Sequence, residues 1–111
     1  MLSEIKLQTE CFIWAWNNLP QTRLCIFHVP NGGLRSKVEA AQLKASGVIA
    51  GIPDILFIWN GRIHAFEFKT KVGQLSPVQR AVHAAWKGQR VDVHVVRSFD
   101  QFKELIISIT N

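Results

Sequence analysis

The sequence contains no long apolar segment of the kind that forms a membrane-spanning helix. Nowhere in its 111 residues does an uninterrupted hydrophobic run approach the roughly 20 residues that such a helix needs. The first four residues, MLSE, also lack the basic segment and the apolar run of a secretory signal peptide. We therefore expect a cytoplasmic protein that has no contact with a membrane.

Cysteine is scarce, and the two cysteines lie far apart. Cys11 and Cys25 show no CxxC or CxxH spacing that would indicate a zinc site or a redox pair. The sequence also contains no HExxH motif and no paired histidines, so a histidine metal site is not expected. We interpret both cysteines as buried thiols.

Acidic residues are outnumbered by basic ones. The chain has 8 Asp and Glu against 13 Lys and Arg, which gives a formal net charge of +5 at pH 7. This balance favours polyanionic partners, although many small basic proteins bind no nucleic acid. On this background Glu10, Asp54 and Glu67 are exceptions that we expect to have a function. A hydrophobic content of 48% fits a single domain, residues 1–111, with one core.

Hydrophobic periodicity and turn residues predict four helices and four strands. Capping patterns that begin at Ser36, Ser76 and Ser98 mark the starts of three of the helices. One tight hairpin combined with helical crossovers implies an α/β fold with a mixed four-stranded sheet flanked by helices. In chain order, the predicted elements are a helix at 3–18, a strand at 24–29, a helix at 36–47, strands at 55–59 and 62–69, a helix at 76–88, a strand at 91–96 and a last helix from 98.

The first predicted helix carries two apolar bands, with Glu10 between them. The second band is either ordinary core and scattered surface residues or a contact with a partner subunit. If the polyanionic partner is double-stranded DNA, a lone domain of this size offers little surface to bind it. This favours the subunit contact and a homodimer. The two bands consist of Leu2, Ile5, Phe12, Ile13 and Trp16, and of Leu7, Cys11 and Trp14.

The dipeptide Asn60-Gly61 predicts a two-residue hairpin turn, because both central positions of such a turn adopt positive φ. The resulting register places Asp54 directly opposite Glu67. Two carboxylates whose Cβ atoms are roughly 4.5–5.5 Å apart destabilise a sheet unless a positive charge lies between them. A divalent cation would supply that charge. Lys69, two positions after Glu67, points to the same side of the sheet.

This trio predicts metal-assisted hydrolysis of a phosphodiester. Carboxylates supply the hard oxygen ligands that suit Mg²⁺, which commonly bridges to substrate phosphates. Lys69 would position the attacking water or stabilise charge on the scissile phosphate. The alternative is a solvated ion pair between Glu67 and Lys69, with Asp54 merely ending a loop after Pro53.

The sequence Ile52-Pro53-Asp54, followed thirteen positions after Asp54 by Glu67-Phe68-Lys69, resembles the PD-(D/E)XK nuclease signature. The surrounding motifs are similar to those of the virus-type replication-repair nuclease (VRR-NUC) domain, over roughly residues 10–96. These motifs are PNGG at 30–33, GV at 47–48, GIPD at 51–54 and LSPVQ at 75–79. The resemblance implies a restriction-endonuclease-like core and a stand-alone, phage-type nuclease domain in a bacterial or phage-infected cell.

The resemblance implies a DNA endonuclease that depends on Mg²⁺ or Mn²⁺. Asp54, Glu67 and the backbone carbonyl of Phe68 would hold the metal, and Lys69 would be catalytic. The substrate it suggests is branched DNA, such as a four-way junction, cleaved by a homodimer. The rivals are a nucleic-acid-binding module that does not cleave, and a nuclease subunit that needs a helicase or another replication or repair partner.

Two further residues correspond to family positions. The family's first-helix acid corresponds to Glu10, for which a solvated helix charge is the alternative. The family's helix glutamine corresponds to Gln79. That residue is also the third helical position of the capping box that begins at Ser76, so a catalytic role, a capping role or both are open.

A glycine-rich turn before the helix at 36–47 has the composition of a phosphate site. Permissive backbone, free amide donors and the positive end of a helix would meet there, although a turn followed by a well-capped helix is the alternative. A basic, flexible loop after Lys69 offers a second contact for a DNA backbone. The residues predicted to bind nucleic acid are Asn31, Gly32, Gly33, Arg35, Ser36, Lys37 and Lys71.

Overall fold

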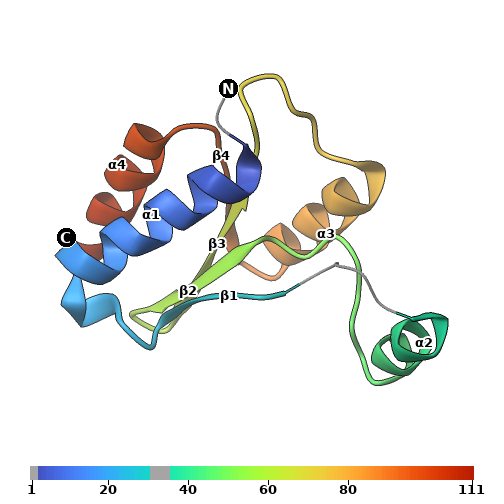
Figure 1. Ribbon diagram of the computed structural model, residues 1–111. Coiled ribbons are helices and arrows are strands. Elements are labelled where there is room, and N and C mark those ends of the chain that lie inside the picture. The colour runs from blue at the N-terminus through green and yellow to red at the C-terminus, as the bar shows by residue number, and fades with distance from the viewer. Residues whose placement is uncertain (1–2, 31–35) are drawn as a thin grey trace.

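The computed structural model describes residues 3–30 and 36–111, which form four α-helices, one short 3₁₀ helix and four strands (Figure 1). The element types and their order confirm the prediction, and most bounds agree within two residues. The elements are α1 Glu4–Asn18, η1 Pro20–Thr22, β1 Ile26–His28, α2 Lys37–Ala45, β2 Ile55–Trp59, β3 Arg62–Phe68, α3 Pro77–Gly88, β4 Asp92–Val96 and α4 Phe99–Thr110.

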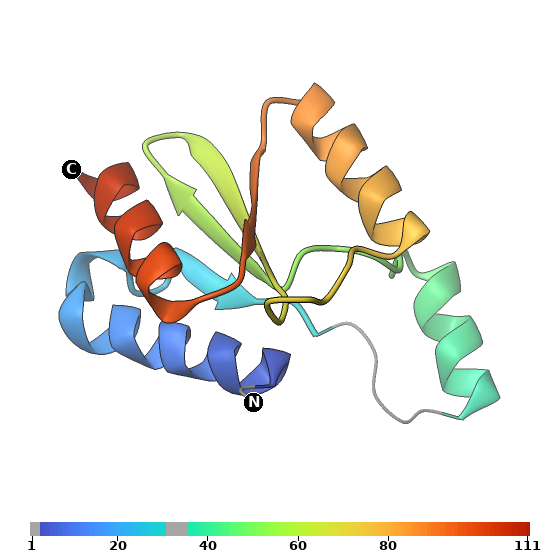
Figure 2. The ribbon, with the colours of Figure 1, turned by 90° about the horizontal axis from the view of Figure 1, so that it is seen from above.

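The strands form one mixed sheet in the order β1-β2-β3-β4. The pairs β1–β2 and β2–β3 are antiparallel, whereas β3 and β4 are parallel. Helices α1 and α4 lie on one side of the sheet and α3 lies on the other (Figure 2). This arrangement confirms the predicted α/β fold with a mixed four-stranded sheet flanked by helices.

The hairpin between β2 and β3 has the predicted register. Asn60 and Gly61 have φ values of 51° and 74°, as a two-residue turn of this kind requires. Trp59 pairs with Arg62, and the ladder continues without a bulge to the start of β2, where Ile55 pairs with Phe66. Because side chains alternate along a strand, this register decides which residues of the hairpin share a face.

The main core lies between the sheet and the pair α1–α4. Phe57 on β2 and Phe66 on β3 are fully buried there, as is Phe102 on α4. The rings of Phe66 and Phe102 meet edge to face, with centroids 5.1 Å apart. The opposite face of the sheet, which α3 covers, carries the charged residues discussed below.

The buried face of α1 is not the expected one. Leu7 and Cys11 are buried in the core, whereas Ile5 from the other apolar band is 63% exposed. Trp14 packs edge-on against Phe99 of α4, with ring centroids 6.0 Å apart. The interpretation of Leu7, Cys11 and Trp14 as a subunit contact was therefore wrong, because this band packs inside the same chain.

Both cysteines are free thiols. Cys11 is buried, and burial is the main reason that its pKa is raised to about 12. Cys25 is only partly buried. The prediction of buried thiols is thus confirmed for the first cysteine and only in part for the second.

Strand β1 is shorter than predicted. Leu24 has a positive φ of 70° and is 91% exposed, so it belongs to a turn and not to the strand. The turn follows η1, in which the Thr22 carbonyl accepts a hydrogen bond from the Cys25 N–H. Helix α1 therefore connects to the sheet through a 3₁₀ turn that the apolar pattern of this segment did not indicate.

Helix α2 stands away from the sheet on the side of α3 (Figures 1 and 2). All nine of its residues are described, and none is buried. A helix this short gains little stability without a packed face. No helix in the described part of the chain is both long and apolar enough to cross a membrane.

Candidate active site

Asp54 lies at the start of β2 and is fixed from two sides. Its backbone carbonyl accepts a hydrogen bond from the Val29 N–H at 3.1 Å, and His28 Nδ1 lies 2.7 Å from the same oxygen. Its carboxylate Oδ2 accepts a hydrogen bond from the Phe68 N–H at 2.8 Å. Asp54 therefore contacts the end of β1 through its backbone carbonyl and the end of β3 through its side chain.

Glu67 lies on β3 and is only 2% exposed. Its pKa is raised to about 9, mainly by burial and then by the hydrogen bond and the negative charge of Asp54, with a smaller contribution from Glu4. The two carboxylates are therefore close enough to share a hydrogen bond, as the hairpin register predicts. A nearby cation would relieve this electrostatic cost.

Lys69 follows β3 and is also buried, with 8% of its surface exposed. Its backbone N–H donates to the Val96 carbonyl at 3.0 Å, which extends the pairing with β4. The positive charge of Lys69 lowers the pKa of the Glu67 carboxyl, whereas burial and Asp54 raise it. The alternative of a solvated ion pair between Glu67 and Lys69 is wrong, because both side chains are buried.

His83 is a site residue that the sequence interpretation missed. It lies on α3, is 4% exposed, and its Nε2 is 3.0 Å from Glu67 Oε1. Burial, followed by the charge of Lys87, lowers its pKa. One signal was available: His83 follows Gln79 by four positions and therefore shares its helix face.

Gln79 caps the start of α3. Its Oε1 accepts a hydrogen bond from the Ser76 N–H at 2.9 Å, and its own N–H donates to the Ser76 hydroxyl at 3.1 Å. Both bonds of the capping box are thus present, with Pro77 at the first helical position. The capping role is confirmed, and the catalytic role stays a prediction.

The acid of α1 that lies beside the carboxylates is Glu4 and not Glu10. Glu4 acts on the pKa of Glu67, and its Oε2 lies close to Gly73 in the loop after Lys69. Glu10 is exposed and lies about 9 Å farther along the helix axis, since each residue rises 1.5 Å. The assignment of Glu10 as a metal ligand is therefore corrected, because the start of α1 and not its middle faces this end of β3.

The loop that carries Asp54 packs against the first turn of α3. Gly51 has a φ of 85°, and a Cβ there would lie 2.7 Å from Val78 Cγ1 and 2.9 Å from the Val78 carbonyl oxygen. Only glycine fits both the backbone conformation and the space. The buried Pro53 then leads into Asp54, so the position of α3 is coupled to that of the carboxylate.

The loop after Lys69 is held by Arg97 and is not simply flexible as predicted. Arg97 Nη1 donates to the carbonyl oxygens of Thr70 and Gly73 at 2.7 and 2.6 Å. The Gly73 N–H also donates to Thr70 Oγ1 at 2.9 Å. Lys71, the residue of this loop predicted to contact DNA, is exposed.

The predicted phosphate-binding turn is described only in part. Asn31, Gly32, Gly33 and Arg35 lie outside the described residues. Ser36 caps α2, because its hydroxyl accepts a hydrogen bond from the Glu39 N–H at 3.1 Å. Lys37 is exposed at the first turn of that helix.

The donor set of the site is small. Among residues 3–30 and 36–111, no three side chains of His, Cys, Asp or Glu come together to hold a metal ion. Glu67 is buried and Asp54 is partly buried beside it, and both carboxylates offer hard oxygens. A Mg²⁺ ion keeps several waters and is commonly held by one or two carboxylates together with substrate phosphates. The pair therefore fits an ion of this kind. It does not fit an ion whose ligands must all come from the protein.

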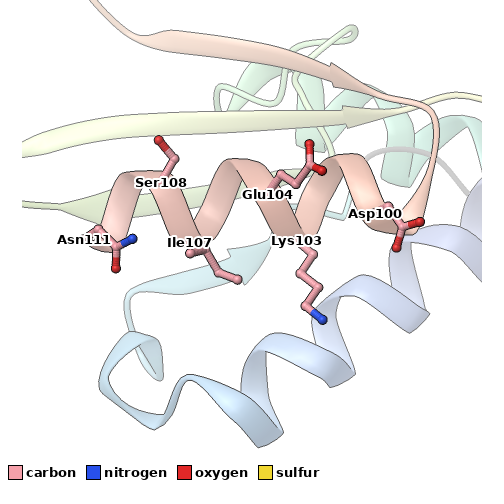
Figure 3. A pocket seen from close by; sticks show the side chains of 6 residues that line it. All are labelled: Asp100, Lys103, Glu104, Ile107, Ser108 and Asn111. Carbon is pink, nitrogen blue, oxygen red and sulfur yellow. The ribbon is translucent and has the colours of Figure 1, made fainter.

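Two hollows outside the carboxylate pair differ in character. A shallow groove along α4 is lined by exposed and partly buried side chains of that helix alone, and its Lys103 points toward α1, where Nζ lies 5.5 Å from the centre of the Trp14 ring (Figure 3). A cavity of about 540 Å³ adjoins Lys69 and is lined by Leu7 and by the segments 69–72 and 97–99. Of the two hollows, only the second includes a residue of the candidate site, Lys69, in its lining.

Two solved structures share this arrangement of elements. The first, described as a VRR_NUC domain protein, superposes with a TM-score of 0.82 at 22% sequence identity, over 98% of this chain and 88% of that one. This chain has the VRR-NUC fold. The second structure, described as a VRR_NUC domain, has a TM-score of 0.58 at 23% identity and covers 88% of this chain and 91% of the other. No protein-family model and no curated protein matches the sequence.

The VRR-NUC fold includes the elements that build the site, because the first match covers almost the whole chain. The hairpin brings Asp54, Glu67 and Lys69 together within it, as predicted. Helix α3 adds His83 on the same face. An identity of 22–23% shows a common fold, so any account of the chemistry has to come from these side chains.

Proposed function

We propose that this protein is a nuclease that hydrolyses DNA phosphodiester bonds with the help of Mg²⁺ or Mn²⁺. One observation carries the proposal: the buried Glu67 and the partly buried Asp54 lie close enough to share a hydrogen bond, beside the buried Lys69, in a chain with the VRR-NUC fold. Opposed buried anions are costly unless a cation binds to them. A structural core would gain nothing from this pair.

In this proposal each residue has one task. Asp54, Glu67 and the carbonyl of Phe68 hold the metal, which when bound polarises the phosphate and lowers the pKa of a bound water. Lys69 orients the water or stabilises negative charge on the phosphate. The hydrogen bond between Asp54 and the Phe68 N–H keeps the two strand ends in register while substrate binds.

The test is a cleavage assay on linear, flapped and four-way DNA with Mg²⁺, Mn²⁺ or EDTA. Wild type should cleave with either metal and not in EDTA, and Asp54→Asn should lose cleavage while it still binds DNA. Asp92→Asn is the matched control, because Asp92 is a partly exposed acid paired with Arg62 and lies at the far end of β4. If wild type and Asp54→Asn bind alike and neither cleaves, the protein is a binding module. Cleavage that appears only after a helicase is added would make it a subunit.

We also propose a preference for branched DNA and a homodimer that presents two sites to two strands. Because Leu7 and Cys11 are buried, the contact must use another surface, and the outward side of α1 exposes Ile5 and Ile13 at 63% and 53%. Sedimentation of wild type and of Ile13→Lys would test this contact. A monomer throughout the micromolar range for wild type would refute the dimer.

A further inference from the structure

The Glu67 side chain has one neutral hydrogen-bond donor among the described side chains, and it comes from α3. His83 Nε2 lies 3.0 Å from Glu67 Oε1, and the two side chains are 5% and 3% exposed. Neither group can exchange this contact for water. A carboxylate with no fixed donor at such depth would be free to rotate toward Asp54 or Lys69.

Helix α3 is well placed to hold that donor still. Its start is fixed by the capping box at Ser76 and Gln79, and its first turn packs against Gly51 just before Asp54. His83 lies one turn after Gln79 on the same face. The helix therefore contacts the carboxylate pair at two points: the Asp54 loop near its start and Glu67 one turn later.

We infer that His83 is a positioning residue: its Nε2–H donates to Glu67 Oε1 and fixes the carboxylate in the orientation that receives the metal beside Asp54. This inference rests on the proposed function. The bond requires the tautomer with a proton on Nε2, since an ionised Glu67 can only accept. Removal of a side chain that hydrogen-bonds to a metal ligand typically lowers metal affinity 10- to 100-fold.

The experiment is a calorimetric titration of the metal-free full chain with Mn²⁺. His83→Leu removes the donor and keeps an apolar side chain, and His83→Gln keeps an N–H at a similar reach. His94→Leu is the matched control, because His94 is a partly buried histidine on the other face of the sheet, stacked on Phe66. We expect His83→Leu to bind Mn²⁺ about 10- to 100-fold more weakly, and His83→Gln and His94→Leu to bind as wild type does.

Three results would overturn the inference. The first is a folded His83→Leu that binds Mn²⁺ as tightly as wild type, and the second is a His83→Gln that loses as much affinity as His83→Leu. If His83→Leu does not fold, two-bond ¹H–¹⁵N NMR of wild type at pH 10, where Glu67 is ionised, decides. A His83 ring that is protonated there on Nδ1 instead of Nε2 would be the third such result. A wild type that binds no Mn²⁺ would refute the proposed function, whereas the NMR result still reports on the hydrogen bond itself.

Discussion

The carboxylate of Asp54 is hydrogen-bonded to the backbone N–H of Phe68, at 2.8 Å. This bond joins the start of β2 to the end of β3, next to Glu67. The two acids are therefore held together by the sheet itself and do not need a cation to bring them into contact. The cost of this arrangement in the metal-free protein can be measured.

We predict that the metal-free protein loses stability as the pH rises above about 4.5. The pKa of Glu67 is raised from 4.5 to about 9, so between these values the unfolded chain releases a proton that the folded chain retains. The unfolded state is thereby favoured as the pH rises. Glu67→Gln stays neutral, should remove this slope and should stabilise the metal-free protein by about 2 kcal/mol at pH 8.

Urea unfolding in EDTA at pH 7 and pH 8.5 measures this effect, because histidines are largely neutral over this range in both the folded and the unfolded chain. Glu104→Gln is the control, since Glu104 is an exposed acid on α4 and its removal should leave the slope unchanged. A wild-type stability that does not fall between the two pH values, or a Glu67→Gln variant less stable than wild type at pH 8.5, would contradict the account.

A second pH effect has the same physical origin and lies on the other face of the sheet. Burial is the main cause that lowers the pKa of both His64 and His94, whose rings stack with centroids 6.4 Å apart. Asp92 opposes the shift in both, and Arg62 adds to it for His64. As the pH falls below about 6.5, the unfolded chain takes up protons that these folded histidines resist, so stability is lost.

His94→Leu tests this prediction. The Nε2 atom of His94 is buried and has no hydrogen-bond partner in the described part of the chain, so the substitution leaves no group unpaired. We expect the variant to be at least as stable as wild type at pH 8, and its advantage in stability over wild type to be larger at pH 5 than at pH 8. A stability difference between the two proteins that is the same at both pH values would show that His94 does not carry the acid sensitivity.

Gly51→Ala should displace the loop that carries Asp54. The new Cβ would lie 2.7 Å from Val78 Cγ1 in addition to the strained φ of 85°, so we expect a loss of about 2–3 kcal/mol and a fall in cleavage. Gly47→Ala has a positive φ of 113° but open space around the Cβ and should cost about 1 kcal/mol with normal cleavage. Thermal unfolding and initial rates of both variants decide, and equal effects would show that the contact with α3 is unimportant.

Arg97→Met should destabilise the loop after Lys69. Two carbonyl oxygens, those of Thr70 and Gly73, lose a charged donor, which costs about 1–3 kcal/mol. Arg80→Met is the control, since Arg80 is an exposed arginine on α3. Hydrogen exchange of residues 70–73 should increase in Arg97→Met alone, and unchanged exchange would mean that Arg97 does not hold the loop.

The hairpin and the acid pair could be predicted because local rules decide them. Asn60-Gly61 determines the turn, and the turn determines a register that ends with the pair Ile55–Phe66. One position further along each strand, this register places Asp54 opposite Glu67. The capping box at Ser76 is also a local pattern, and the structure contains both of its bonds.

The orientation of α1 could not be predicted in this way. Apolar side chains lie on most of its circumference, so periodicity alone did not decide between Leu7 and Ile5 as the core-facing residue. The same packing decides whether Glu4 or Glu10 lies beside the carboxylates, because it sets which end of α1 meets the loop after β3. His83 meets Glu67 only because α3 crosses back over that face of the sheet, which no local pattern specifies.

The central claim is that Asp54 and Glu67 together hold a divalent cation. The most direct measurement is the Mn²⁺ binding isotherm of wild type, Glu67→Gln and Asp92→Asn in one buffer. We predict that wild type and Asp92→Asn bind with the same affinity and that Glu67→Gln binds at least tenfold more weakly, because loss of one carboxylate removes half of the charged donor set. Equal binding by Glu67→Gln and wild type, or no binding by wild type, would contradict the claim.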